Sequence, residues 1–170
     1  MSITLDGLYQ LSPDTLDKAL SALTSNANHH TEAGRILRAI KARSGCVGRI
    51  LNKSSVPAIQ AALPGYIITY SIQDFLKRRP RCIYVRRLDE QGQPISGPGS
   101  HWSFELATSD EPHLTAERLD ERIAYHAEQT KRYSVYAAEL PAQVAAYYAA
   151  AAYLRPIKNS ISTALIYAGL

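Results

Sequence analysis

The sequence predicts an α+β fold, in which helices and a small antiparallel sheet form the centre and a helical unit follows at the C-terminus. Two observations lead to this class. Between residues 13 and 63, hydrophobic residues recur at helical spacing between turn-forming segments. From residue 66 the pattern changes to short aromatic and β-branched runs, such as YIITY and CIYVRRL, and from residue 115 it is helical again. We therefore expect a domain of residues 1–108 and a helical dimerisation or interaction region of residues 109–170.

The N-terminal part of the chain predicts two helices. Ser12 can cap the first, and Pro13 suits its first turn. The polar run 24–31 is expected to end this helix, because it interrupts the spaced leucines that precede it. Thr31 can cap a second helix, which Gly45 is expected to stop.

Short elements are expected in the centre of the chain. Residues 46–51 and 56–63 predict two short helices, separated by a polar turn. Residues 66–70, 83–85 and 102–106 have the composition of strands. The segment KRRPR lies between the first two strands, where it would give their connection a basic tip.

The C-terminal part predicts long helices. Its apolar seam repeats in heptads, at Leu119, Ile123, His126, Thr130, Tyr133, Ala137 and Leu140. Pro141 and Pro156 are expected to divide the remainder into two further helices. We expect these helices to form a homodimer.

The charge distribution predicts a polyanionic partner for the middle of the chain. Residues 32–108 hold 12 of the 19 Lys and Arg residues but only 5 of the 15 Asp and Glu residues. This segment therefore has a net charge of +7, whereas the remainder has −3. A basic segment of this kind is typical of nucleic-acid binding.

Residues 56–63 satisfy what a helix needs to enter the major groove, since their outward positions are small or polar. Gln60 is of the residue type that pairs with adenine. The predicted contacts of this helix and its surroundings are Arg49, Lys53, Ser54, Ser55 and Gln60. The predicted backbone contacts of the hairpin tip are Lys77, Arg78, Arg79 and Arg81.

Residues 32–88 resemble winged helix-turn-helix transcription regulators. The likeness rests on three segments: ILRAIKARSG, SSVPAIQAAL and PGYII. It implies a winged-helix-like core, with a recognition helix near 54–63 and a basic wing near 77–87. The function it implies is that of a non-enzymatic transcriptional regulator, which binds specific sequences of double-stranded DNA as a dimer.

A cysteine hydrolase is the alternative. Cys46 follows Ser44 and Gly45 at an expected helix start, where the pKa of a thiol is lowered. His101 lies downstream at the start of an expected strand, which is the order of papain-like folds, and Asp110 or Glu105 would orient its imidazole. The segment CVGRILNKSSVP is also similar to the nucleophile helix of papain-like cell-wall amidase effectors.

A small inhibitor or interaction protein that binds another protein is the third interpretation. No cofactor or metal is expected, because His29 and His30 have no further ligand at metal-binding spacing. Two cysteines do not predict a disulfide framework. The sequence shows no export signal and no run long enough for a membrane span, so a cytoplasmic protein without a membrane partner is expected.

Overall fold

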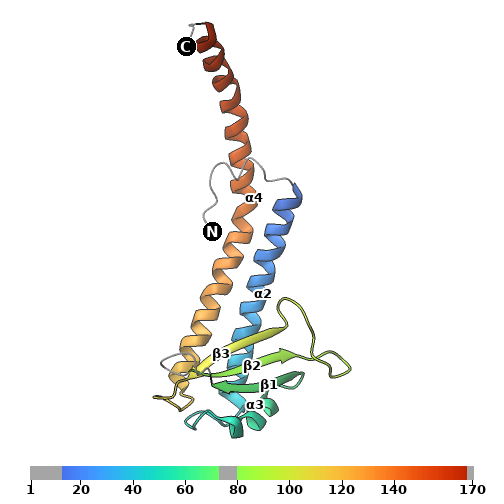
Figure 1. Cartoon of the computed structure of the whole chain (residues 1–170), viewed down its shortest axis with the longest axis vertical. Helices are drawn as coiled ribbons and strands as arrows, with labels where there is room; N and C mark the ends of the chain where they lie inside the picture. The colour runs from blue at the N-terminus through green and yellow to red at the C-terminus, as the bar shows by residue number, and fades with distance from the viewer. Residues whose placement is uncertain (1–12, 73–79, 168–170) are drawn as a thin grey trace. The chain divides into compact units, whose positions relative to one another are not determined.

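The computed structural model describes residues 13–72 and 80–167. It confirms the α+β class (Figure 1). Along the chain, helices precede a three-stranded antiparallel sheet, and one long helix follows it. The chain divides into two compact units. One is Thr24–Tyr133, which contains the sheet, and the other combines the described residues up to Leu23 with those from Ser134 onward. The domain boundary expected from the sequence lies after residue 108, whereas in the structure residues 109–133 belong to the unit that contains the sheet.

Helix α2 runs without a break from Pro13 to Arg43, so the predicted interruption at residues 24–31 is wrong. This run contains no glycine or proline, and each of its polar residues costs a helix only about 0.7 kcal/mol or less. Within the run Ala27 is buried, and the Thr31 hydroxyl donates to its carbonyl oxygen at 2.9 Å. The predicted stop is confirmed, because Gly45 follows the helix with a φ of +62°.

The helix predicted at residues 46–51 is also wrong. Gly48 has a φ of +82°, which a right-handed helix does not allow. The segment is instead bonded to a distant part of the chain. The amide of Leu51 donates to Pro112 at 2.8 Å, and the amide of Leu114 donates to Arg49 at 2.9 Å. Backbone groups that a helix would satisfy internally are therefore satisfied by residues 112–114.

The second short helix is confirmed as α3, Val56–Ala62, which follows a 3₁₀ turn η1 at Lys53–Ser55. Asn52 caps that turn, because its side-chain oxygen accepts from the Ser54 amide at 2.9 Å while its own amide donates to the Ser55 hydroxyl at 3.3 Å. Such reciprocal capping fixes the direction in which α3 begins.

Three strands form the sheet in the order β1-β2-β3, with β1 at Tyr66–Ile72, β2 at Arg81–Arg87 and β3 at His101–Ala107. Both pairings are antiparallel. One face of the sheet is covered, and its side chains join those of the helices in the core. The largest fully buried side chains are Ile36, Leu37, Ile40, Leu51, Ile59, Leu63, Ile83, Val85, Leu106, Leu114 and Leu119.

Helix α4 extends from Ala116 to Tyr167 as one element, so the predicted divisions at Pro141 and Pro156 are wrong. An interior proline removes one hydrogen bond and crowds the carbonyl four residues before it, at a cost of about 3 kcal/mol. Alanine favours helix more than any other residue, and the many alanines between these two prolines offset part of that cost. Each of the seven predicted seam positions is buried or half-buried. None of the helices in the described ranges has the length and apolarity that crossing a membrane requires.

Candidate nucleic-acid interface

A hollow of about 420 Å³ lies where the segment between α2 and α3 meets the start of α3. Its lining is formed by Cys46, Arg49, Ile50, Asn52, Ser54, Ser55 and Ala58. Three of the predicted DNA contacts and the alternative nucleophile are thus brought to one place. Because the backbone of Arg49 is held at both its amide and its carbonyl, the base of its side chain has a fixed position.

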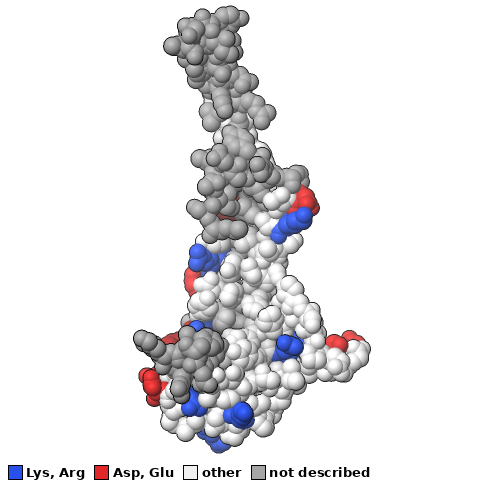
Figure 2. All heavy atoms as spheres, viewed as in Figure 1, with Lys and Arg blue, Asp and Glu red and all other residues white. Residues whose placement is uncertain are grey.

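Four cations between residues 38 and 53, of which Arg49 lines this hollow, carry no compensating charge. Arg38, Arg43, Arg49 and Lys53 are exposed and form no ion pair with any residue that the structure describes. No Asp or Glu occurs between residues 33 and 73. Figure 2 shows Lys and Arg side chains close together at the lower end of the view, the end at which Figure 1 places α3. We call Arg43, Arg49, Lys53 and Ser54 the basic loop surface.

Two side chains that were predicted to contact DNA, Gln60 and Ser55, instead form hydrogen bonds within the fold. Gln60 donates to the Tyr66 carbonyl, at 2.5 Å, and accepts from the Ile68 amide at 3.0 Å. Its side-chain amide therefore closes part of the free edge of β1, as edge strands commonly require. Ser55 is buried, and its hydroxyl donates to the Ile50 carbonyl at 3.0 Å. Neither side chain is presented to a ligand in this geometry.

Arg81 likewise serves the fold. Its guanidinium donates to the Leu51 carbonyl at 2.8 Å and to the Tyr70 hydroxyl at 3.3 Å. It thereby ties the start of β2 to the loop that precedes η1. Strands β1 and β2 are joined as a hairpin, with Ile72 opposite Arg81. The remaining predicted tip residues, Lys77, Arg78 and Arg79, lie outside the described residues.

The structure does not bring Cys46 and His101 together. Cys46 is 3% exposed and follows the C-terminal end of α2. His101 lies near the middle of that helix, where its charge acts on His29. The fourteen residues from His29 to Arg43 separate His29 from the end of the helix by about 21 Å along its axis. Asp110 lines a different hollow, of about 490 Å³, so the three residues form no catalytic group.

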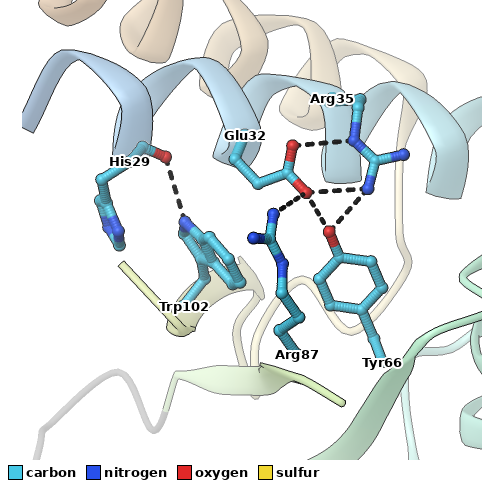
Figure 3. A network of polar contacts seen from close by, with 6 residues as sticks. All are labelled: His29, Glu32, Arg35, Tyr66, Arg87 and Trp102. Carbon is cyan, nitrogen blue, oxygen red and sulfur yellow. Dashed lines mark hydrogen bonds and ion pairs between the residues drawn. The ribbon is translucent and has the colours of Figure 1, made fainter. Parts of the chain in front are cut away.

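A polar cluster that the sequence did not predict joins α2 to the sheet (Figure 3). The Glu32 carboxylate accepts from Arg35 at 2.8 Å, from Arg87 at 3.2 Å and from the Tyr66 hydroxyl. The hydrogen bonds from Arg35 are the largest cause that lowers the pKa of Glu32 to about 2. The sequence contains one indication of this cluster. Glu32 is the only acidic residue between Asp17 and Asp74, so it is the one carboxylate in that stretch with which an arginine can pair. We call these four residues the Glu32 cluster.

A histidine cluster joins α2 to α4 within the sheet-containing unit. The Nδ1 atoms of His30 and His126 are 2.8 Å apart. His29 stacks on Trp102, whose indole N–H donates to the His29 carbonyl at 3.1 Å (Figure 3). Burial lowers the pKa of all three histidines, and that of His126 falls to about 4. They are therefore neutral at pH 7 and do not extend the basic surface.

Comparisons with protein-family models, with curated proteins and with solved structures find nothing that matches this chain.

Proposed function

We propose that this protein is a non-enzymatic DNA-binding regulator that holds the phosphate backbone through the basic loop surface. The observation that carries the proposal is the set of exposed cations at the end of α2 and before α3, which have no carboxylate partner in the described part of the chain. Folded proteins pair or disperse their charges, so a local excess of one sign favours a ligand of the other sign. A row of phosphates is the ligand that matches it.

The order of elements supports the same proposal. A helix, α3, is followed directly by the β1–β2 hairpin, which is the order that a winged helix-turn-helix uses to place one element in a groove and the other on the backbone. In this arrangement Arg49 and Lys53 neutralise phosphates, and the Ser54 hydroxyl lies beside them. Because the Gln60 side chain is hydrogen-bonded to β1, the exposed apolar residues Pro57 and Ala61 would contact the bases. Alanine can contact the thymine methyl group.

Helix α4 supports the proposal of a homodimer. Between Tyr133 and Leu154 it carries a single charged residue, Glu139. Several of its large side chains in this stretch are nevertheless exposed, including Tyr136, Tyr148 and Tyr153. An apolar helix surface of this kind is stabilised by a second helix, and a two-fold dimer would match the two halves of a palindromic site.

A salt titration tests the proposal. A fluorescein-labelled duplex of mixed sequence is titrated with the whole protein, and anisotropy is followed at about 50 and 200 mM salt. Three neutralised phosphates predict a slope of log K against log salt of about −3, which weakens binding at least about 40-fold over this range. Absence of binding at the lower salt would remove the proposal.

A further inference from the structure

The described residues leave part of one sheet face exposed, whereas Cys82 on the same face is buried. Side chains alternate across a strand, so the neighbours of the buried core residues point to the opposite face. On that face Ile67 is 42% exposed and Tyr84 is 36% exposed. Thr69, Arg86, His101 and Ser103 are exposed as well. We call these six residues the outer sheet face.

The register sets these six side chains in two rows. Thr69, Tyr84 and Ser103 are cross-strand partners in one row, and Ile67, Arg86 and His101 are partners in the next. Directly opposed side chains lie about 5 Å apart, and the two rows are about 7 Å apart along the strands. An aromatic ring in the central strand thus has a hydroxyl on either side and a guanidinium one row away.

A shallow hollow of about 240 Å³ continues this face toward α4. Ser103 belongs to both the outer sheet face and the hollow. Arg122 and Tyr125 of α4 line its other side, and the ring of Tyr125 is 50% exposed. A second cation and a second aromatic ring therefore lie beside the first pair.

The charge and composition of this face decide which ligand it fits. The hollow beside the face is lined by one carboxylate among the described residues, Glu105, which is paired with Arg118 at 3.4 Å. Arg86 and Arg122 form no ion pair with a described carboxylate, so the face has a net positive charge. Most of its side chains are polar, whereas the centre of a protein–protein interface is depleted of charge. Aromatic rings beside cations on a rigid sheet are what unpaired bases and their phosphates require.

We propose that the outer sheet face binds single-stranded nucleic acid, with one base stacked on Tyr84 and phosphates on Arg86 and Arg122. This inference goes beyond the proposed function, because it concerns different residues and a strand whose bases are unpaired. Duplex DNA does not fit here, since its bases are stacked within the helix and cannot lie on an aromatic ring.

The test uses labelled oligo-dT and oligo-U of 12 nucleotides and the whole protein. Tyr84→Ala is expected to weaken binding of a single strand by about 5- to 150-fold, because it removes one stacked base. Tyr84→Phe keeps the ring and is expected to bind within about twofold of the wild type. A preference for one of the two oligonucleotides distinguishes RNA from DNA as the ligand. Unchanged melting temperatures show that both variants fold.

Three results would overturn the inference. The first is no binding of either oligonucleotide by the wild type. The second is equal binding by Tyr84→Ala and the wild type, together with a loss when Arg49 and Lys53 are changed to alanine, which would assign the strand to the basic loop surface. In the third, Tyr84→Ala converts a dimer to a monomer in sedimentation without affecting the oligonucleotides, which would make this face a protein interface.

Discussion

The Glu32 cluster and the basic loop surface both contain arginines from the same basic stretch of sequence, but they differ in what surrounds the charge. In the cluster, one carboxylate accepts from two arginines and a tyrosine that come from α2, β1 and β2. In the basic loop surface, Arg43, Arg49 and Lys53 have no carboxylate partner among the described residues. Net charge alone therefore does not locate a binding site, because paired cations hold the fold and only unpaired ones are available to a ligand.

The largest expected effect belongs to Glu32→Gln. This change removes the negative charge while leaving Arg35 and Arg87 in place, and it replaces one acceptor oxygen with an amide NH2 group that faces other donors. Because Arg35 and Arg87 are 56% and 47% exposed, solvent screens part of this pairing, and we expect the free energy of unfolding to fall by about 2 kcal/mol. The melting temperature then falls by about 4–8 °C for a chain of this size. Thermal unfolding followed by circular dichroism measures it. Asp14→Asn, which removes an exposed pair with Lys18, is the control and should change little; equal melting of the two variants would contradict the role of the cluster.

The histidine cluster predicts a pH dependence. Because burial lowers the pKa of His126 in the folded state to about 4, the unfolded chain binds protons more readily than the folded one. Above pH 6.5 His126 is neutral in both states and costs no stability. As the pH falls toward 4, stability falls by about 2 kcal/mol, which is less than the full shift would give because the half-buried side chain is partly screened by solvent. The Glu32 carboxylate, with its pKa near 2, adds a loss between about pH 4.5 and 2.

Urea unfolding at pH 7, 5.5 and 4.5 measures this dependence, and His126→Phe is the informative variant. It keeps an aromatic ring against Phe104 and Tyr125 but cannot be protonated. The groups whose charges act on His126 are His29, His30 and Arg122, and they remain in both proteins. We expect the variant to lose less stability than the wild type between pH 7 and 4.5. Parallel losses would show that His126 does not carry the dependence.

A smaller effect is expected for Gln60→Ala. The substitution leaves the Ile68 amide and the Tyr66 carbonyl without their side-chain partner at the edge of β1. The expected cost is about 1–2 kcal/mol of unfolding free energy, with duplex affinity unchanged at a temperature where the variant is folded. A large loss of DNA affinity without a loss of stability would restore Gln60 as a base contact.

The smallest effect on stability is expected at the basic loop surface. Arg49→Ala removes an exposed side chain that has no ion pair with a described residue, so unfolding free energy should change by less than about 0.5 kcal/mol. Chemical denaturation measures the change. A cost comparable to that of Glu32→Gln would show that Arg49 serves the fold, and would remove the contrast between the two groups of cations.

Local pattern predicted much of the fold. The alternation of strands β1 and β3, the helix at 56–63, the stop at Gly45 and the seam of α4 each depend on residues close together in the sequence. The breaks wrongly expected at 24–31, Pro141 and Pro156 gave too much weight to residues that a long helix tolerates. The error at 46–51 arose because distant residues decide the outcome. Residues 46–51 are held by 112–114, and no local signal in the sequence indicates that pairing.

The candidate site shows the same division. The sequence predicted Arg49 and Lys53 as contacts, and both side chains are exposed. The uses of Gln60, Ser55 and Arg81 within the fold could not be predicted, because their partners belong to other elements or to the loop that η1 closes. A polar side chain near a helix predicted to enter the major groove can contact DNA only if it is not already hydrogen-bonded to a backbone group of its own fold.

The measurement that tests the central claim most directly compares two triple variants of equal charge in the duplex salt titration. Arg43→Ala with Arg49→Ala and Lys53→Ala removes the basic loop surface, and Lys18→Ala with Lys131→Ala and Arg132→Ala removes three exposed cations elsewhere. We expect the first variant to flatten the slope of log K against log salt by about 3, while the second leaves it near that of the wild type. The same slope in both variants would contradict the proposal, since binding would then depend on net charge and not on this surface.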